Sequence, residues 1–346
     1  MSAAVYDFRS DNVGGIAPEL LEALQAANIG AAAPYGDDDF TRAMTAQFRR
    51  VFEHDALTAI PISTGTGANA IALAGLANPY GAIYCHETAH INVYECGAPE
   101  FFTGAKLVGL RGGADYKLDA AQLDAELTLA GRGNPTRVQP FAVNITQPTD
   151  FGTLYDVDEI RAVCEVAHRH GALVHLDGAR FANAIAALGC TPAAMTWRAG
   201  VDIVSFGATK NGAMNAEAIL VFDAAVAAKL PYLMKRGGQV VSKARFISAQ
   251  LGRYLQDDRW LERARQSNAN AAALAGRLRA IPGVDLVGRV DINMLFTRLP
   301  DAAVAALDAG PFRYYKLGRE QRFVCRHDVE QAGIDALVRT IKEASA

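Results

Sequence analysis

Short apolar runs alternate with helical patterns through the middle of this chain, and the alternation limits the folds that it can adopt. In residues 156–171 a helical pattern places Ile160, Val163 and Ala167 on one face, and Gly171 can end that helix. Strands and helices in succession predict a mostly parallel sheet covered by helices. The runs that we predict as strands are "TAIPI" (58–62), "GAIYC" (81–85), "AKLVGL" (105–110), "QPFAVNI" (139–145), "ALVHL" (172–176), "DIVSF" (202–206) and "EAILVF" (217–222).

The pattern changes after about residue 240. Residues 242–283 indicate two or more helices, strand-like segments follow at 292–299 and 322–327, and a helix is expected at the end. We therefore predict an N-terminal segment with a large α/β domain in residues 1–240, and a smaller α+β domain in residues 241–346.

Composition argues against several other classes of protein. The 346 residues are 51% hydrophobic and 21% charged with a net charge of −3, so no basic field favours nucleic acid. No apolar stretch is long enough to cross a membrane, and the start "MSAAVYDFRSDN" lacks the pattern of a secretory signal. Five scattered cysteines without a CxxC pair predict neither disulfides nor a metal site, and favour the reducing cytoplasm.

Charged residues that could form a ligand site follow two neighbouring predicted strands in the middle of the chain. Lys210 comes shortly after "VDIVSFG", and Asp177 and Arg180 follow "ALVHL". In sheets of this kind ligands gather at the carboxyl ends of the strands. Taken alone, Lys210 is also compatible with a solvated loop lysine, and Asp177 with a turn or a structural pair with Arg180.

A third segment, "TAIPISTGTGANAIALAGLA" (58–77), predicts a strand, a Gly/Thr turn and a helix. Backbone N–H groups in such a turn, together with the N-terminus of a helix, can bind a phosphate. A plain turn with Thr66 capping the helix is the simpler alternative. A second alternative is a dinucleotide site, because Gly65, Gly67 and Ala70 match G-x-G-x-x-A and Glu87 follows at a suitable distance.

One cofactor gives all three segments a role. Pyridoxal 5'-phosphate needs a lysine for its aldehyde, a carboxylate for its pyridine nitrogen and an anion site for its phosphate. Lys210, Asp177 and the turn at Gly65 and Thr66 supply these groups. A dinucleotide would leave Lys210 and Asp177 without a function.

The sequence resembles the threonine aldolase and β-eliminating lyase branch of the fold-type I pyridoxal phosphate enzymes. The similar segments follow the family's order over most of the chain, and "HLDGAR" with "TKNG" are the most specific. They are "FRSDN" (8–12), "PYGDD" (34–38), "STGTGAN" (63–69), "HETAHINVYE" (86–95), "HLDGAR" (175–180), "SFGATKNG" (205–212), "SKARF" (242–246) and "RFVCRHD" (322–328). The resemblance implies an aspartate-aminotransferase-like fold, with a three-layer αβα large domain and a smaller α+β domain.

The resemblance also implies the role of individual residues. Lys210 binds the cofactor aldehyde, Asp177 pairs with the pyridine nitrogen, and Gly65 and Thr66 hold the phosphate. Arg180 lies near the cofactor ring oxygen and the substrate carboxylate. The other implied positions are His90 stacked on the ring, Ser10 and Arg322 at the substrate carboxylate, and Tyr35 and Arg245 reaching the site of a neighbouring subunit. A homo-oligomer, a dimer or a tetramer with sites at subunit interfaces, is therefore expected.

Two histidine questions accompany these assignments. His86 and His90 are four residues apart and could share one helical face, and the spacing in the family favours His90. Relatives carry a second active-site histidine before a "VQP"-like strand, where this chain has Thr136 and Arg137. The group that contacts the substrate β-hydroxyl is thus open, with His90, or a water that it holds, as the expected base.

The implied reaction is retro-aldol cleavage of L-threonine or L-allo-threonine to glycine and an aldehyde, with phenylserine-like β-hydroxy-α-amino acids as further substrates. An aminotransferase or a β-eliminating lyase would use the same cofactor and lysine. A nicotinamide-dependent dehydrogenase and a non-catalytic homologue are the alternatives from other classes.

Overall fold

The computed structural model describes residues 5–345, and its centre is a seven-stranded sheet. Six strands run in one direction, and β8 is antiparallel to both of its neighbours. In spatial order the strands are β2 (Thr58–Ile62), β8 (Glu217–Val221), β7 (Ile203–Gly207), β6 (Leu173–Gly178), β5 (Gln139–Thr146), β3 (Gly81–His86) and β4 (Lys106–Leu110). Each apolar run predicted as a strand overlaps one of these seven, so the sequence prediction of a mostly parallel sheet is confirmed.

The reversed direction of β8 is a consequence of the short connection that precedes it. Only residues 208–216 separate β7 from β8, and they contain Lys210. A parallel crossover needs about a dozen residues or more, so this connection returns the chain as a hairpin-like pair. Phe206 and Ala218 face each other across that pair.

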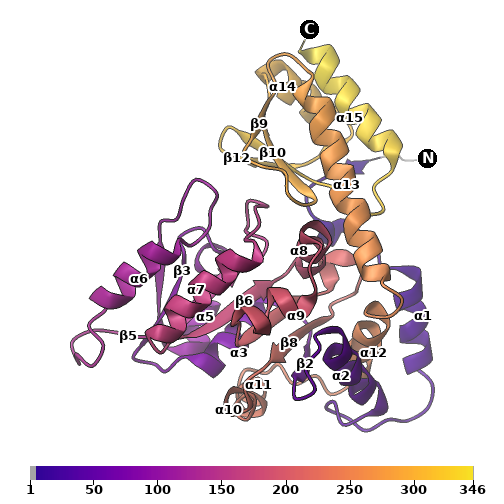
Figure 1. The fold of residues 1–346 in the computed structure, drawn as a ribbon. Helices are drawn as coiled ribbons and strands as arrows, with labels where there is room; N and C mark the ends of the chain where they lie inside the picture. The colour runs from indigo at the N-terminus through magenta and orange to yellow at the C-terminus, as the bar shows by residue number, and fades with distance from the viewer. Residues whose placement is uncertain (1–4, 346) are drawn as a thin grey trace.

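Helices cover both faces of the sheet, which gives three layers (Figure 1). Alternate residues of β7 belong to different hydrophobic clusters: Val204 and Phe206 to one, Ile203 to the other. The helices of this part are α1 (Pro18–Ala27), α2 (Asp39–Val51), α3 (Gly65–Leu76), α4 (His90–Val93), α5 (Ala98–Thr103), α6 (Ala120–Leu129), α7 (Val157–Arg169), α8 (Phe181–Leu188), α9 (Pro192–Met195), α10 (Ala224–Ala227), α11 (Leu230–Arg236) and α12 (Arg245–Tyr254). Short 3-10 turns occur at Asp11–Val13, Trp197–Ala199 and Thr209–Asn211.

Helix α7 shows how local sequence determines an element. Asp156 caps its N-terminus, and Glu159 returns a hydrogen bond to the backbone of Asp156, which forms a capping box. At the other end Gly171 has a φ of 66°, a left-handed conformation that glycine adopts without strain. The helix predicted for residues 156–171 is therefore present between these two signals.

A second, four-stranded antiparallel sheet lies in the C-terminal part of the chain. Its hydrophobic core is shared with three helices that form the upper part of Figure 1. They are α13 (Arg259–Arg279), α14 (Asp301–Ala309) and α15 (Gln331–Ala344). Its strands are, in order, β12 (Tyr315–Leu317), β13 (Glu320–Val324), β10 (Met294–Arg298) and β9 (Asp285–Val287).

The N-terminal segment packs against this C-terminal unit. Strand β1 (Tyr6–Asp7) pairs in parallel with β11 (Phe312–Arg313), and the fully buried Phe8 belongs to the hydrophobic cluster of that unit. Helix α12, in contrast, packs on α1 and α2 of the large part. The division at residues 240 and 241 stays a prediction, and the packing changes from one core to the other along α13.

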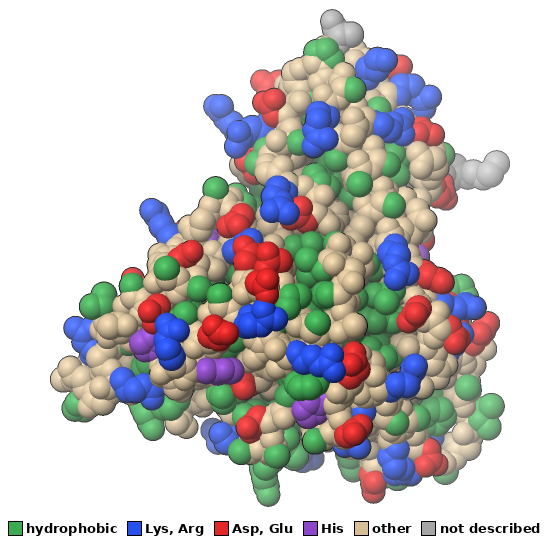
Figure 2. Space-filling model, in the orientation of Figure 1, with side chains coloured by type: hydrophobic (Ala, Val, Ile, Leu, Met, Phe, Trp, Pro, Cys, Tyr) green, Lys and Arg blue, Asp and Glu red, His purple; other side chains and the backbone are tan. Residues whose placement is uncertain are grey.

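No helix within residues 5–345 is both long enough and apolar enough to cross a membrane. The face drawn in Figure 2 carries basic and acidic side chains that are interspersed with one another.

Candidate active site

Lys210 lies where the buried strand β7 ends. The strand stops at Gly207, and Lys210 follows in the turn Thr209–Asn211. A Cβ on Gly207 would lie 2.6 Å from the backbone oxygen of Ala179, so only glycine permits this close approach of two strand-end loops. Burial, with the nearby charge of Arg180, lowers the pKa of Lys210, which favours the neutral, nucleophilic amine.

Asp177 and Arg180 lie at the neighbouring strand end. Asp177 is near the end of β6, with only 3% of the residue exposed. Its Oδ1 accepts from the backbone N–H of Ala179 at 3.1 Å. Arg180 donates through Nε to Oδ2 of Asp11 at 2.7 Å, so it pairs with the N-terminal segment and not with Asp177.

The Gly/Thr turn forms the N-terminus of α3. Thr64 caps the helix by accepting from the backbone N–H of Gly67 at 3.1 Å, so the alternative in which Thr66 is the cap is wrong. Gly65 and Thr66 begin the helix, and a Cβ on Gly65 would meet no atom within 4 Å. Free N–H groups with open space before them form an anion site.

His90 belongs to a hydrogen-bonded group that the sequence did not indicate. Oε1 of the buried Glu95 accepts from Nδ1 of His90 at 2.9 Å and from Nδ2 of Asn69 at 2.7 Å. The same amide group of Asn69 donates to Oδ2 of Asp177 at 3.0 Å. The hydrogen bond to Glu95 raises the pKa of His90, because it stabilises the imidazolium form.

These strand-end and helix-end residues line one cavity. Lys210, Asp177 and the N-terminus of α3 thus meet, although they lie far apart in the sequence. The lining residues are Gly65, Thr66, Asn69, His90, Glu95, Thr146, Pro148, Asp150, Asp177, Ala179, Arg180 and Lys210.

Asp150 is a second lining residue that the sequence prediction missed. It follows β5, the strand beside β6, and therefore lies at the same edge of the sheet as Asp177. The rule that selected Asp177 and Lys210 could have found it, but three residues, 147–149, separate Asp150 from the end of its strand. Asn69 lies one helical turn after Gly65 on α3, so its position on the helix that begins at the predicted phosphate turn could have revealed it. No local sequence pattern marks Glu95 or Asp11 as a site residue.

A second cavity shares His90 and Asp150 with the first. Its walls are mainly aromatic, and they include Arg322, which the resemblance assigns to the substrate carboxylate. The lining residues are His90, Tyr94, Asp150, Phe151, Phe296, Tyr315, Leu317 and Arg322. Ser10 lines neither cavity, and its hydroxyl accepts from the backbone N–H of Asn12 at 3.2 Å.

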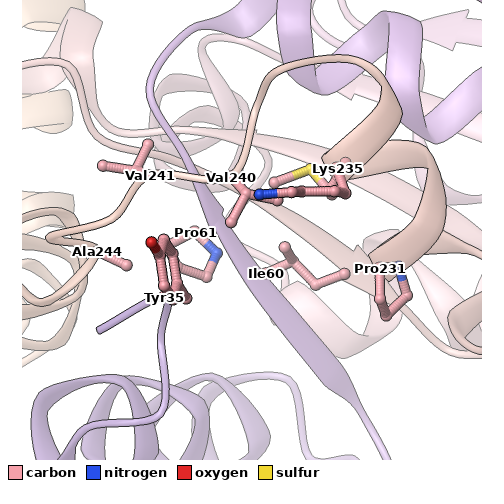
Figure 3. A pocket seen from close by; sticks show the side chains of 9 residues that line it. Tyr35, Ile60, Pro61, Pro231, Lys235, Val240, Val241 and Ala244 are labelled. Carbon is pink, nitrogen blue, oxygen red and sulfur yellow. The ribbon is translucent and has the colours of Figure 1, made fainter. Parts of the chain in front are cut away.

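Tyr35 and Arg245 do not meet the other site residues within this chain. Tyr35, 62% exposed, lines a separate apolar cavity, where Figure 3 shows it beside Pro61 and Ala244. The ammonium of Lys235 lies 5.8 Å from its ring centre. Arg245 begins α12 and donates to the backbone oxygen of Gly30 at 3.2 Å.

The structure separates His86 from His90. His86 ends β3 and is buried beside Thr88, with its Nδ1 2.8 Å from the hydroxyl, whereas His90 begins α4. The expectation that both could share one helical face is therefore wrong, and only His90 lines the cavity.

The segment at Thr136 lies at the opposite edge of the sheet. It precedes the first residue of β5, while Asp177 lies near the carboxyl end of β6 and Lys210 follows the carboxyl end of β7. Thr136 is exposed, and its hydroxyl donates to Oδ1 of Asn134 at 2.7 Å. The position where a second histidine was expected is therefore not part of this cavity.

Sheet order removes the dinucleotide alternative. A dinucleotide fingerprint needs the strand before its glycines and the strand before its acidic residue to be neighbours. Here β2 and β3 are separated by β8, β7, β6 and β5. Glu87 lines no part of the cavity and lies 3.6 Å from Nε of Arg111.

The geometry agrees with comparisons to known proteins. A family model described as beta-eliminating lyase matches residues 7–301. The chain belongs to this family. A low specificity L-threonine aldolase from Pseudomonas aeruginosa is 40% identical over 345 residues, which cover 99% of this chain and 99% of that protein. This enzyme family depends on pyridoxal phosphate, as predicted.

Solved structures of family members and more distant enzymes share the fold. A threonine aldolase from Leishmania major superposes with a TM-score of 0.92 at 27% identity, covering 99% of this chain and 100% of the other. An aspartate aminotransferase from Rhodobacter sphaeroides gives a TM-score of 0.71 at 16% identity, covering 100% and 95%. The predicted aspartate-aminotransferase-like fold is confirmed.

The cavity suits the cofactor of the family. It combines an amine, a buried carboxylate and a helix N-terminus with open space at Gly65. Three polar atoms around it are buried without a hydrogen-bond partner among the described residues: Oδ1 of Asn69, Oε2 of Glu95 and Oδ2 of Asp150. Unpaired buried polar atoms are costly, and a polar ligand would satisfy them.

Proposed function

We propose that this protein is a low-specificity L-threonine aldolase that cleaves L-threonine and L-allo-threonine to glycine and acetaldehyde. The observation that supports this most is the meeting of Lys210, Asp177 and the N-terminus of α3 in one cavity. The adjoining aromatic cavity supports phenylserine-like substrates as well, because it offers apolar walls to a side chain on the β-carbon.

Each group in the cavity has a defined task. Bound pyridoxal phosphate supplies an aldehyde for amino groups and a ring that withdraws electrons. Lys210 holds that aldehyde, Gly65 and Thr66 bind the phosphate, and Asp177 keeps the pyridine nitrogen protonated. His90 lies against the ring.

Binding of the amino acid uses a second set of residues. Arg180, held by Asp11, and Arg322 attract the substrate carboxylate, and Ser10 is the third proposed carboxylate ligand. Burial, with the charge of Arg180, lowers the pKa of Arg322, whose Nε has no partner among the described residues. That free donor is available to an anionic substrate.

Product analysis tests the proposal. Purified protein with pyridoxal phosphate should release glycine and an aldehyde from L-threonine, L-allo-threonine and L-phenylserine. Release of ammonia with a keto acid would indicate β-elimination, and amino-group transfer to a keto acid would indicate an aminotransferase. Absence of all three with the cofactor bound would indicate a non-catalytic homologue.

We also propose a homo-oligomer, a dimer or a tetramer, in which Tyr35 and Arg245 reach the site of a neighbouring subunit. Tyr35 has a φ of 62°, an unusual value for a non-glycine residue, and such strain often accompanies function. The apolar cavity beside it supports a contact at this surface (Figure 3).

A mixing experiment tests the shared site. Lys210→Ala and Arg245→Ala subunits, each inactive alone, should regain activity after they are mixed and exchanged. Each hybrid dimer would then contain one site with both natural residues. No recovery, although an affinity tag on one variant retains the untagged other variant after mixing, would place Arg245 outside the neighbouring site.

The five cysteines support the proposed cytoplasmic location, because all of them are free thiols. Fractionation of cells followed by the glycine-release assay tests this.

A further inference from the structure

Asp150 lies where the two cavities meet. It lines the inner cavity with Lys210 and Asp177, and the outer, mainly aromatic cavity with Phe151 and Phe296. An amino acid whose amino group lies near Lys210 and whose side chain reaches the outer cavity would pass Asp150 at its β-carbon. This position follows from the two lining sets alone.

Asp150 has no partner that would explain a structural role. Its Oδ2 is buried without a hydrogen-bond partner among residues 5–345. Every other site carboxyl described above accepts hydrogen bonds: Asp11, Glu95 and Asp177. Glu95 also has an unpartnered oxygen, Oε2, but its Oε1 already accepts two hydrogen bonds, whereas Asp150 accepts none from the described residues and can accept a donor from a ligand.

The surrounding charges set its protonation. Burial raises the pKa of Asp150 to about 6, and the negative charge of Asp177 acts in the same direction. The positive charges of His90, Lys210 and Arg180 oppose this rise. A group with a pKa near 6 is ionised at neutral pH and still basic enough to take a proton.

His90 is the less suitable base of the two. Nδ1 of His90 is bonded to Glu95, and that bond raises the pKa of His90, which favours the cationic form. A cationic imidazole cannot accept a proton. The carboxylate of Asp150, which is half-buried with its Oδ2 fully enclosed, has no such restriction.

We propose that Asp150 holds the β-hydroxyl group of the substrate and takes its proton as the Cα–Cβ bond breaks. This inference depends on the aldolase function proposed above. The substrate O–H bond breaks and a new O–H bond forms at Oδ2 of Asp150. The carbon–oxygen bond becomes double, and the electron pair of the Cα–Cβ bond stays with Cα. The aldehyde leaves, and a proton added to Cα completes glycine, so no oxidant or reductant is consumed.

Asp150→Asn tests the proposal with nearly unchanged shape. We expect kcat/KM for L-threonine to fall by about 10²–10⁴-fold, the usual contribution of a general base. In the natural protein kcat/KM should fall as the pH drops through about 6, because Asp150 becomes protonated. The residual kcat/KM of Asp150→Asn should not show this fall at low pH, which we call the acidic limb of the pH profile.

Asp158→Asn is the matched control. Asp158 pairs with Arg161 on the surface, and 87% of its side chain is exposed. This variant removes the same charge outside the site, so it should keep both kcat/KM and the acidic limb. Its loss of the limb would attribute the limb to general charge effects and overturn the assignment.

Two further measurements do not depend on turnover. Glycine has no β-hydroxyl, so its dissociation constant, followed by the visible spectrum, should change less than threefold in Asp150→Asn. In cofactor-free protein labelled with [4-13C]aspartate, infrared titration should show a carboxyl band near pH 6 that Asp150→Asn lacks.

The outcomes separate the two proposals. A natural protein that releases no glycine from threonine contradicts the aldolase function, and the infrared titration then still tests the Asp150 carboxyl. A natural aldolase whose Asp150→Asn variant keeps kcat/KM within threefold, keeps the acidic limb, or binds glycine more than tenfold weaker overturns the role of Asp150. The last result would assign Asp150 to the amino group of the substrate.

Discussion

Arg180 and Asp11 form a buried ion pair across 169 residues of sequence: Nε of Arg180 donates to Oδ2 of Asp11 at 2.7 Å. Only 10% and 4% of the two side chains are exposed. Oδ1 of Asp11 also accepts from Nδ2 of Asn293 at 2.5 Å. The orientation of Arg180 in the site therefore depends on the N-terminal segment and on its contact with the C-terminal unit.

Asp11→Asn should destabilise the protein and weaken substrate binding. Removing one partner of a buried ion pair costs about 3–5 kcal/mol of unfolding free energy, because the other charge stays buried. Denaturant titration of the cofactor-free protein should show a loss of this size, and KM for L-threonine should rise about tenfold. Asp335→Asn, at the exposed pair with Arg277, should cost at most about 1 kcal/mol. Equal losses in the two variants would contradict the role of burial.

Lys210→Ala should keep the fold and lose covalent attachment of the cofactor. The visible absorbance of the lysine-bound cofactor and its trapping by borohydride should both disappear. Because burial lowers the pKa of Lys210, the charged amine opposes folding at neutral pH, and the cofactor-free variant should be at least as stable. The exposed Lys106→Ala variant should retain both signals. A trapped adduct and normal turnover in Lys210→Ala would assign the attachment to another residue.

Asp177→Asn should bind the cofactor weakly and turn over slowly. A charge-assisted hydrogen bond of this kind contributes about 1.5–3 kcal/mol, and losing it predicts a fall in kcat of at least about tenfold to a hundredfold. Asp202→Asn is the control. The carboxyl group of Asp202 lies outside the cavity and is hydrogen-bonded to the backbone N–H of Val174 and to the ring of His168. Natural rates in Asp177→Asn would show that another group holds the ring nitrogen.

His90→Asn should be much more damaging to retro-aldol turnover than Thr136→Ala, with the cofactor still bound in both. His90 lines the cavity, whereas Thr136 is in an exposed turn at the opposite edge of the sheet. We expect at least about a tenfold fall in kcat for His90→Asn and no measurable change for Thr136→Ala. The reverse order would mean that the active site includes the segment before β5.

The buried His175 should make stability depend on pH. Its Nδ1 donates to Asn144 at 2.7 Å, Ser205 lies 2.9 Å from Nε2, and burial lowers the pKa of His175 to about 4. An unfolded histidine has a pKa near 6.5. The contribution of neutral His175 to the unfolding free energy is therefore complete above that pH and is lost as the pH falls towards 4. The difference corresponds to about 3 kcal/mol.

Denaturant titrations between pH 7.5 and pH 4.5 check this. The unfolding free energy of His175→Gln should fall less steeply than that of the natural protein. His168 is the control, because its hydrogen bond to Asp202 raises its pKa, and its contribution is lost as the pH rises. Parallel pH curves for His175→Gln and the natural protein would exclude His175 as the source.

Local patterns were sufficient for much of the fold and for part of the candidate site. Apolar runs indicated the strands of the large sheet, and the capping signals of α7 marked both of its ends. Lys210 and Asp177 were predicted because each lies at or shortly after the end of a buried strand, and the edge where such strands end is a property of any parallel sheet. These features depend on residues that are close in sequence.

Only the tertiary structure decided which distant residues meet. Asn69 bridges Glu95 and Asp177, and Asp11 holds Arg180, because separate strand ends and the N-terminal segment converge at one cavity. Burial of a side chain and the charges around it are set by packing between segments. The sequence alone therefore determined the strands, the cofactor class and the candidate lysine, and the packing decided the partners of each charge.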